Sequence, residues 1–218
     1  LDAWSDTRGT VVLARVYAER APQDVDIAYG ALRLAMRHEE HCGDAWHMEE
    51  RDGQLALTLI DGLGHGLQAS DAAEAGIDAL EADGPLEPMA LIGRMHARMS
   101  GTRGGAAAVA CVTLDSGTLQ FAGIGNISAS VIDLAATRGL ASHPGIVGVQ
   151  YRKAQAFHLH AQQGNLLLMH TDGLQARWSL RDYPGLFQRH PALVVAILQR
   201  DFDRGRDDVG IVAWRLGA

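Results

Sequence analysis

Short apolar runs, each bounded by polar or turn-forming residues, recur along most of the chain and predict β-strands joined as hairpins. The clearest case is residues 45–50 and 54–60, which flank the turn letters RDG. In the second run Leu55, Leu57 and Leu59 share one face, which is typical of a strand with one side buried.

Similar runs elsewhere extend this pattern. The letters AAAVACVTL and TLQFAGIGNISASVI, separated by DSG, predict a second hairpin, and two runs around QQGN predict a third. The two runs of the third hairpin are residues 157–160 and 166–170. Single strands are expected near the ends of the chain, at residues 11–17, 27–36 and 210–216.

Three segments instead repeat their apolar residues at helical spacing. The first, residues 67–82, ends at the letters DGP; the second carries a stripe from Met89 to Met99; the third is residues 191–200. We interpret the methionine stripe as core packing, because Met fills irregular gaps. Since the strands come as neighbouring hairpins with two helices inserted together, the order favours antiparallel sheets over repeated βαβ units.

Composition narrows the class of protein. The chain has 218 residues, 47% of them hydrophobic, which is enough for one domain with a sizeable core. Its net charge of −7 and the lack of a Lys-rich run argue against nucleic-acid binding, and no apolar run of the sequence is long enough to span a membrane. No signal peptide is visible, and Cys42 and Cys111 lack metal-type or redox spacing, so we expect a cytoplasmic protein.

Acidic residues recur at the ends of predicted strands. Asp61 and Asp172 each end an apolar run and are each followed by glycine, while Asp44 precedes the first hairpin and Asp207 and Asp208 precede the last strand. A single aspartate of this kind is common in turns. Four such places in one chain suggest a shared purpose, because carboxylates that converge must either repel one another or share cations.

Oxygen ligands of this type suit Mg²⁺ or Mn²⁺. Two such ions can hold a bridging water, lower its pKa and orient it for in-line attack on phosphorus. A glycine directly after Asp61 can offer its backbone carbonyl to a metal without a side chain in the way. The backbone N–H groups of a glycine loop can bind phosphate, but the Asp61 carboxylate would repel it. A cation between the two would remove that repulsion.

Six motifs together resemble a known family. The letters CGDAW, DGLGHG, GTRGG, GIGN, HTDGL and RDD occur in the order and spacing of the SpoIIE-like branch of PPM-type serine/threonine protein phosphatases, from Asp44 to the C-terminus. The resemblance implies an α+β fold, a four-layer α/β/β/α sandwich of two antiparallel sheets flanked by helix pairs, with two Mn²⁺ or Mg²⁺ ions at one end. It implies hydrolysis of phosphoserine or phosphothreonine on a bacterial regulatory protein, such as a phosphorylated anti-anti-sigma (STAS) protein of a stress or sporulation switch.

The resemblance also implies roles for individual residues. Asp61 would bridge both metals, Gly62 would ligate through its carbonyl, and Asp172 and Asp207 would hold one metal. Asp44 would ligate directly or through water.

Two further positions complete that motif comparison. Asp208 lies next to a ligand position and would support it by hydrogen bonding. Gly210 departs from the family pattern, because Thr or Ser usually stands there, so a hydroxyl behind the metal ligands is expected to be missing.

The N-terminal letters WSDTRGTVVLARVYA resemble the last turn and strand of a GHKL-type ATP-binding domain, as in bacterial proteins that fuse such a domain to a SpoIIE-like phosphatase. We therefore expect residues 1–20 to be the remnant of, or linker from, an upstream domain, and residues 21–218 to form the phosphatase domain. A first residue other than Met agrees with a piece of a longer protein.

Several polar residues allow two interpretations each. His65 in the glycine loop is either a general acid or partner of a metal-bound water, or a loop-packing histidine. Arg103 either meets the phosphate or holds its loop through carbonyls. Asn126 is interpreted as a turn or sheet-bridging residue. Cys42 as a nucleophile, and a zinc site that uses nearby histidines, are both disfavoured.

Two rival functions remain. The letters GHGLQA fit a dinucleotide-binding fingerprint, with Glu81 further on, but Asp61 would repel a pyrophosphate and no parallel strand follows. The other rival is a catalytically weak phosphatase relative that acts as a binding module in sigma-factor regulation. Retention of all the acids argues against it, and Gly210 leaves it open.

Overall fold

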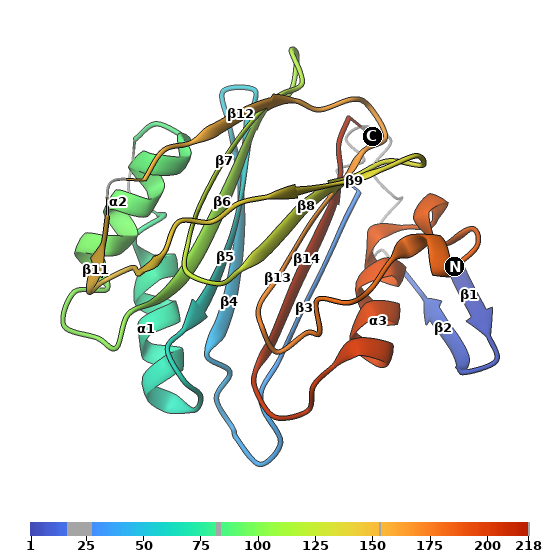
Figure 1. Cartoon of the computed structure of the whole chain (residues 1–218), viewed down its shortest axis with the longest axis horizontal. Helices are drawn as coiled ribbons and strands as arrows, with labels where there is room; N and C mark the ends of the chain where they lie inside the picture. Colours follow the sequence, from blue (N-terminus) through green and yellow to red (C-terminus); the bar gives the residue numbers. More distant parts are fainter. Residues whose placement is uncertain (17–27, 82–83, 153, 218) are drawn as a thin grey trace.

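Two five-stranded antiparallel sheets lie face to face in the computed structural model, which describes residues 1–16, 28–81, 84–152 and 154–217. Figure 1 shows both sheets near edge-on, with helices on their outer sides. The first sheet has the order β12-β7-β6-β5-β4. Its strands are β4 (Asp44–Arg51), β5 (Gln54–Gly62), β6 (Gly105–Thr113), β7 (Thr118–Ile124) and β12 (Phe157–His160).

The second sheet has the order β3-β14-β13-β8-β9 and brings together segments from most of the chain. Its strands are β3 (Tyr29–Leu34), β8 (Ser128–Ile132), β9 (Thr137–Leu140), β13 (Leu166–His170) and β14 (Val209–Arg215). Every strand pair within the two large sheets is antiparallel in the described ranges. That arrangement confirms the predicted α+β sandwich and contradicts the dinucleotide-binding alternative, which needs a parallel sheet.

Alternating side chains explain why β5 lies between two apolar layers. Leu55, Leu57 and Leu59 face the layer between the sheets, whereas Ala56 and Ile60 face the helices. The helix side is covered by α1 (Leu67–Asp78) and α2 (Pro88–Arg98), as the helical spacing predicts. Because β5 is buried on both faces, its register is strongly specified, and with it the position of the acid at its end.

The outer face of the second sheet is covered differently from the helix pair that the resemblance implies. Among the described residues one α-helix, α3 (Pro191–Phe202), packs on β3 and β14, together with the 3₁₀ turns η1 (Leu180–Asp182) and η2 (Leu186–Gln188). The hairpin of β1 (Asp2–Asp6) and β2 (Gly9–Leu13) lies beyond α3 (Figure 1). Its Trp4 joins the apolar cluster beneath α3.

The strand expected at residues 11–17 overlaps β2 only as far as Leu13, because residues 14–16 are described and lie outside any strand. Residue 17 and the proposed domain boundary between residues 20 and 21 lie outside the described ranges, so the boundary stays a prediction. Arg200 of α3 bonds both the Gly9 carbonyl and the Asp6 carboxylate, so the hairpin is attached to the sandwich by side-chain contacts.

One predicted hairpin is wrong. The runs on either side of QQGN do not pair: β12 pairs with β7 in the first sheet, and β13 pairs with β8 and β14 in the second. The predicted second hairpin holds for β6 and β7, but β8 then leaves for the other sheet. Both differences have one cause, since the chain crosses between facing sheets at these loops, and local alternation cannot distinguish a crossing from a turn.

A short sheet of β10 (Gly145–Ile146) and β11 (Gln150–Tyr151) completes the described elements. No helix within the described ranges is both long enough and apolar enough to cross a membrane.

Candidate active site

Two of the predicted acids are direct neighbours in the first sheet. Asp44 is the first residue of β4 and Asp61 the last but one of β5, and the antiparallel register places them opposite each other. Asp44 is only 1% exposed. A pair of carboxylates in this position is destabilising unless a proton or a cation intervenes.

The second sheet presents its acids at the same end. Asp172 follows β13 and Asp207 precedes β14, and these two strands are neighbours. The Asn126 amide, just after β7, donates a hydrogen bond of 2.8 Å to the Asp172 carboxylate. This contact joins the two sheets, as the sheet-bridging interpretation of Asn126 predicted.

The carboxylates perturb one another strongly. Burial, with repulsion from Asp172 and Asp207, raises the pKa of Asp61 to about 7. Burial and repulsion from Asp61 raise the pKa of Asp44 well above its usual range. Burial, and then repulsion from Asp172, also raises the pKa of Asp207. Acids from four separate segments therefore share one electrostatic environment.

The described ion pairs leave this negative charge without a basic partner. Within the part of the chain that the structure describes, no lysine or arginine forms an ion pair with Asp44, Asp61, Asp172 or Asp207. His65 lies near Asp207, and this proximity offsets only a small part of the upward shift in the pKa of Asp207. A partly buried acidic cluster without a described ion pair fits a bound divalent cation, because oxygen ligands and excess negative charge are what Mg²⁺ and Mn²⁺ require.

The cluster is not a preformed ligand cage. Among the described residues, no three His, Cys, Asp or Glu side chains converge in a geometry that holds an ion. Mutual repulsion accounts for this, since carboxylates without a cation gain by keeping apart. The structure thus brings the predicted acids together and leaves the individual ligand roles as predictions.

Asp208 differs from its neighbour Asp207. Its carboxylate is buried and accepts two hydrogen bonds of 2.7 Å, from the backbone N–H groups of Met36 and Gly43. Its own N–H donates to the Asp207 carboxylate at 3.0 Å. Asp208 therefore fixes the 36–43 loop against β14, and it supports Asp207 through its backbone.

A hydroxyl is present where the sequence comparison expected one to be missing. Thr171 donates a hydrogen bond of 2.8 Å to the Asp44 carboxylate and accepts one of 2.9 Å from the Gly210 N–H. A β-carbon at Gly210 would lie 3.1 Å from the Asp44 side chain. Thr171, at the end of the neighbouring strand, thus supplies the hydroxyl contact to Asp44 that Gly210 cannot make. The motif HTDGL in the sequence did not single out Thr171.

Glycine is required next to Asp61 and Asp172 by close backbone approach. A β-carbon on Gly62 would lie 2.1 Å from the Ala69 carbonyl oxygen of α1, and one on Gly173 would lie 1.9 Å from the Asp208 carbonyl oxygen. These contacts are shorter than any real carbon–oxygen contact. The two glycines thus let α1 and β14 approach the strand ends that carry the acids.

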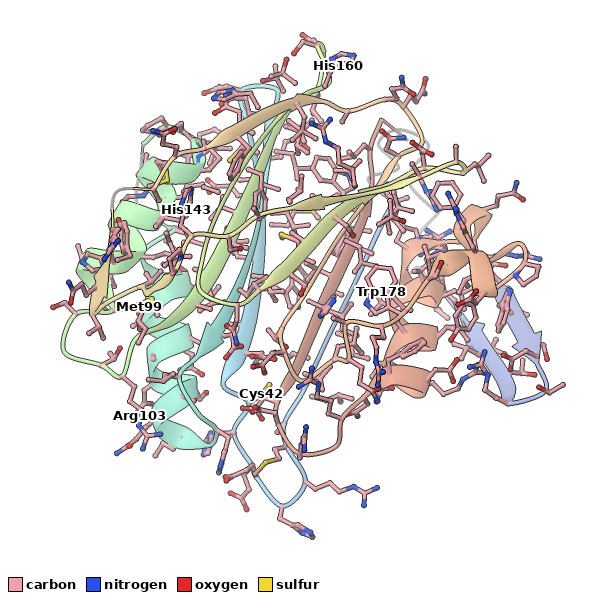
Figure 2. The ribbon with its side chains drawn as sticks, in the orientation of Figure 1. Cys42, Met99, Arg103, His143, His160 and Trp178 are labelled. Atoms are coloured by element: carbon pink, nitrogen blue, oxygen red, sulfur yellow. The ribbon has the colours of Figure 1, made fainter. Side chains whose placement is uncertain are left out.

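The remaining predicted side chains lie at the rim. The His65 ring nitrogen Nδ1 is 2.8 Å from the Glu39 carboxylate, a partner that no sequence pattern indicated. Arg103 is exposed, and its guanidinium lies close to Gly64 of the glycine loop. Figure 2 shows Arg103 at the outer edge on the α1 side, and Cys42 at the same end of the sandwich. Neither proposed role of His65 or Arg103 is decided by these contacts.

The disfavoured chemistries gain no support. Burial raises the pKa of Cys42 to about 12, so its thiol is a poor nucleophile at neutral pH. Trp178, labelled in Figure 2, is a packing residue: it donates a hydrogen bond of 3.2 Å to the buried His170 ring and contacts that ring edge-on.

A cavity of about 630 Å³ opens at the opposite end of the sandwich, near His160 (Figure 2). Its lining includes Val112, Leu216 and Asp115, and none of the clustered acids. This cavity therefore lacks the group of carboxylates that could hold a cation at the end of the sandwich carrying Asp61.

Comparison with known proteins agrees with this geometry. A family model described as stage II sporulation protein E (SpoIIE) matches residues 51–215, a range that includes Asp61, Asp172 and Asp207 and begins after Asp44. The comparison with curated proteins gave no significant match.

Three solved structures illustrate the similarity. A chain from work on the bacterial stressosome, a modular system adapted to control secondary messenger signalling, is 27% identical with a TM-score of 0.79, covering 88% of this chain and 100% of that one. RsbX in complex with magnesium is 19% identical with a TM-score of 0.70, covering 85% and 93%. The PP2C phosphatase domain of SpoIIE from Bacillus subtilis, with a fragment of its regulatory domain, is 18% identical with a TM-score of 0.69, covering 95% and 65%.

Proposed function

Because this chain belongs to the SpoIIE family of PP2C-type serine/threonine phosphatases, we propose that it hydrolyses phosphoserine or phosphothreonine on a bacterial regulatory protein. The proposed cofactors are two Mn²⁺ or Mg²⁺ ions. The observation that carries the proposal is the uncompensated acidic cluster, in which burial and neighbouring carboxylates raise the pKa of Asp61 to about 7. A cluster of this kind has no evident structural use, because it destabilises the metal-free fold.

The proposed ligands are Asp61, the Gly62 carbonyl, Asp172 and Asp207, with Asp44 as a direct or water-mediated ligand. When bound, two divalent cations lower the pKa of a shared water and orient it for attack on phosphorus. The protein holds these groups from two sheets, so that Asp61 faces acids that are far away in sequence.

Neighbouring polar groups orient the proposed ligands. Asn126 fixes one oxygen of Asp172 and Thr171 fixes one oxygen of Asp44, which leaves the other oxygen of each carboxylate available to a cation. For His65, whose ring nitrogen lies 2.8 Å from the Glu39 carboxylate, the proposed role is to donate a proton to the departing serine oxygen.

The substrate is proposed to be a phosphorylated STAS-type anti-anti-sigma protein. The support is contextual, because the similar structures include RsbX, SpoIIE and a stressosome chain.

Hydrolysis of an aryl phosphate tests the proposal. We expect Mn²⁺-dependent turnover that chelator abolishes and that Asp61→Asn or Asp172→Asn lowers by about three orders of magnitude or more, while circular dichroism shows an unchanged fold. A matched control is Asp115→Asn, at the opposite end, which should leave turnover unchanged. Wild-type rates in either active-site variant would refute the assignment.

The alternative is a binding module that retains the fold without turnover. Gly210 is the observation that favours it, because the family usually has a hydroxyl residue there. A folded wild-type protein that binds a phosphoprotein but shows no metal-dependent hydrolysis of aryl phosphates, phosphopeptides or phosphoproteins would support this alternative.

A further inference from the structure

Three arginines gather beside the acidic cluster. A cavity of about 450 Å³ is lined by Gln175, Ala176, Arg177, Arg204 and Arg206. None of these lining residues carries a carboxylate, in a chain whose net charge is −7. The cavity is therefore a local concentration of positive charge on an acidic protein.

The loops that carry the arginines also carry proposed metal ligands. Asp172 lies five residues before Arg177, and Asp207 directly follows Arg206. Backbone hydrogen bonds join the two loops, since Arg204 N–H donates to the Gly173 carbonyl at 3.0 Å. A second bond of 2.9 Å runs between the backbones of residues 175 and 202. The arginine cavity and these two acids are thus carried by one pair of hydrogen-bonded loops.

These guanidinium groups are available to a ligand. All three arginines are exposed, and none forms an ion pair with a carboxylate in the described ranges. The acid on the same loop, Asp203, is already engaged by the Gly205 N–H at 2.6 Å and by the Gln199 amide at 3.1 Å.

Some arginines elsewhere in this chain behave differently. Arg200 pairs with Asp6 and Asp201, and Arg8 pairs with the same two acids. Exposed arginines without a described ion pair also occur elsewhere, as at Arg138 and Arg152, so what distinguishes the three arginines of these loops is that they line one cavity.

We propose that this arginine pocket, defined by Arg177, Arg204 and Arg206, binds an anionic group of the phosphoprotein substrate that is separate from the phosphate to be hydrolysed. Guanidinium groups bind carboxylates and phosphates through paired hydrogen bonds, so the ligand is an Asp or Glu side chain or a second phosphate on the same segment. This inference rests on the proposed function, and it adds a substrate preference to it. The pocket orients a segment whose phosphoserine reaches the acidic cluster next to it.

Binding without catalysis tests the pocket directly. Fluorescein-labelled peptides of one backbone sequence carry either three Glu, three phosphoserines or three Gln, and anisotropy is measured in EDTA at low salt. We expect the two anionic peptides to bind at least tenfold more tightly than the neutral one, with a steep salt dependence. The Glu and phosphoserine arms show which anion the pocket prefers.

The variants are matched in charge. R204Q/R206Q should remove most of this preference, whereas R138Q/R152Q, which changes two exposed arginines elsewhere, should keep it. R177Q alone should weaken binding of the anionic peptides severalfold. Equal binding of all three peptides by the wild type, or equal losses in the two double variants, would overturn the inference.

Kinetics separate this inference from the proposed function. With Mn²⁺, kcat/KM is compared for monophosphorylated peptides whose flanks carry Glu or Gln. We expect kcat/KM of the wild type to be about ten times higher for the Glu-flanked peptide than for the Gln-flanked one. A fall of this ratio towards one in R204Q/R206Q supports the pocket. Turnover of both peptides with a ratio of one overturns the pocket and keeps the phosphatase, whereas no turnover of either peptide counts against the phosphatase and leaves the anisotropy result to decide the pocket.

Discussion

Thr171 joins the two sheets by donating a hydrogen bond of 2.8 Å to Asp44. The threonine follows a strand of the second sheet and the aspartate begins a strand of the first. The same hydroxyl accepts a hydrogen bond from the Gly210 N–H. One side chain therefore fixes the orientation of a buried carboxylate and satisfies a backbone donor, at the end where the acids gather.

Thr171→Val should weaken both functions of this hydroxyl. The change leaves Asp44 and the Gly210 N–H without their partner, at a cost of about 1–3 kcal/mol in the free energy of unfolding. It should also weaken Mn²⁺ binding by roughly 10–100-fold, as expected for a residue that orients a ligand. Urea unfolding and calorimetric metal titration measure the two effects. Thr171→Ser keeps the hydroxyl and should stay within about threefold of wild-type affinity; an equally large loss would show that the methyl group matters instead.

Asp207 and Asp208 should separate activity from stability although they are adjacent. Asp208→Ala leaves the Met36 and Gly43 N–H groups unpaired, so we expect it to lower the free energy of unfolding by about 2–4 kcal/mol. Asp207→Asn should leave unfolding nearly unchanged and reduce metal-dependent turnover by about two orders of magnitude or more. Denaturant titration and aryl phosphate kinetics on both variants check this pair. A stable Asp208→Ala protein would show that its carboxylate is dispensable for the 36–43 loop.

The stability of metal-free protein should decrease as pH rises through neutrality. Burial and neighbouring carboxylates raise the pKa of Asp61 from 3.8 to about 7, so the folded state holds a proton that the unfolded state has lost. The contribution of the Asp61 carboxyl group to the free energy of unfolding is fully present below pH 4 and is lost as pH rises through 7. A loss of roughly 2 kcal/mol would lower Tm by about 4–8 °C in a domain of this size. Thermal unfolding in EDTA between pH 5 and 8 measures it.

Two controls identify the source of that pH dependence. Asp61→Asn should flatten the Tm profile, because the variant has no carboxyl group to deprotonate, and excess Mg²⁺ should reverse the profile by favouring the ionised acids. The Arg200 guanidinium lowers the pKa of Asp201, so the stabilisation from that pair is lost only at acid pH, below this window. A Tm that rises between pH 6 and 8 in EDTA would contradict the shared environment of the acids.

Gly62→Ala should be much more damaging than an ordinary substitution of glycine. Its β-carbon would lie 2.1 Å from the Ala69 carbonyl oxygen, so α1 or the end of β5 must move, and Asp61 moves with it. We expect a loss of about 2–4 kcal/mol in the free energy of unfolding, together with weaker metal binding. Gly93→Ala in α2 is the matched control, because nothing lies near its β-carbon, and it should stabilise by about 0.5–1 kcal/mol. Equal effects of the two changes would show that the approach of α1 is not needed.

The sequence by itself determined the main strands, the helices and the candidate acids. Strands such as β5 alternate apolar side chains, and α1 and α2 repeat them at helical spacing, so local pattern was sufficient. The six motifs placed Asp44, Asp61, Asp172 and Asp207 in one candidate site before any contact was known. Their shared position at strand ends, beside glycine or another acid, already implied a cation.

Tertiary structure alone decided which strands pair and what adjacent residues do. The crossing of the chain between sheets after β7 and after β12 depends on long-range burial, and alternation along a strand does not record its partner. The motif RDD indicated a supporting role for Asp208, but the fold shows which groups it binds, because the 36–43 loop that it holds is distant in sequence, while Asp207 joins the acids. The arginine pocket likewise requires residues 177 and 204 to meet, which only the bonding of two distant loops achieves.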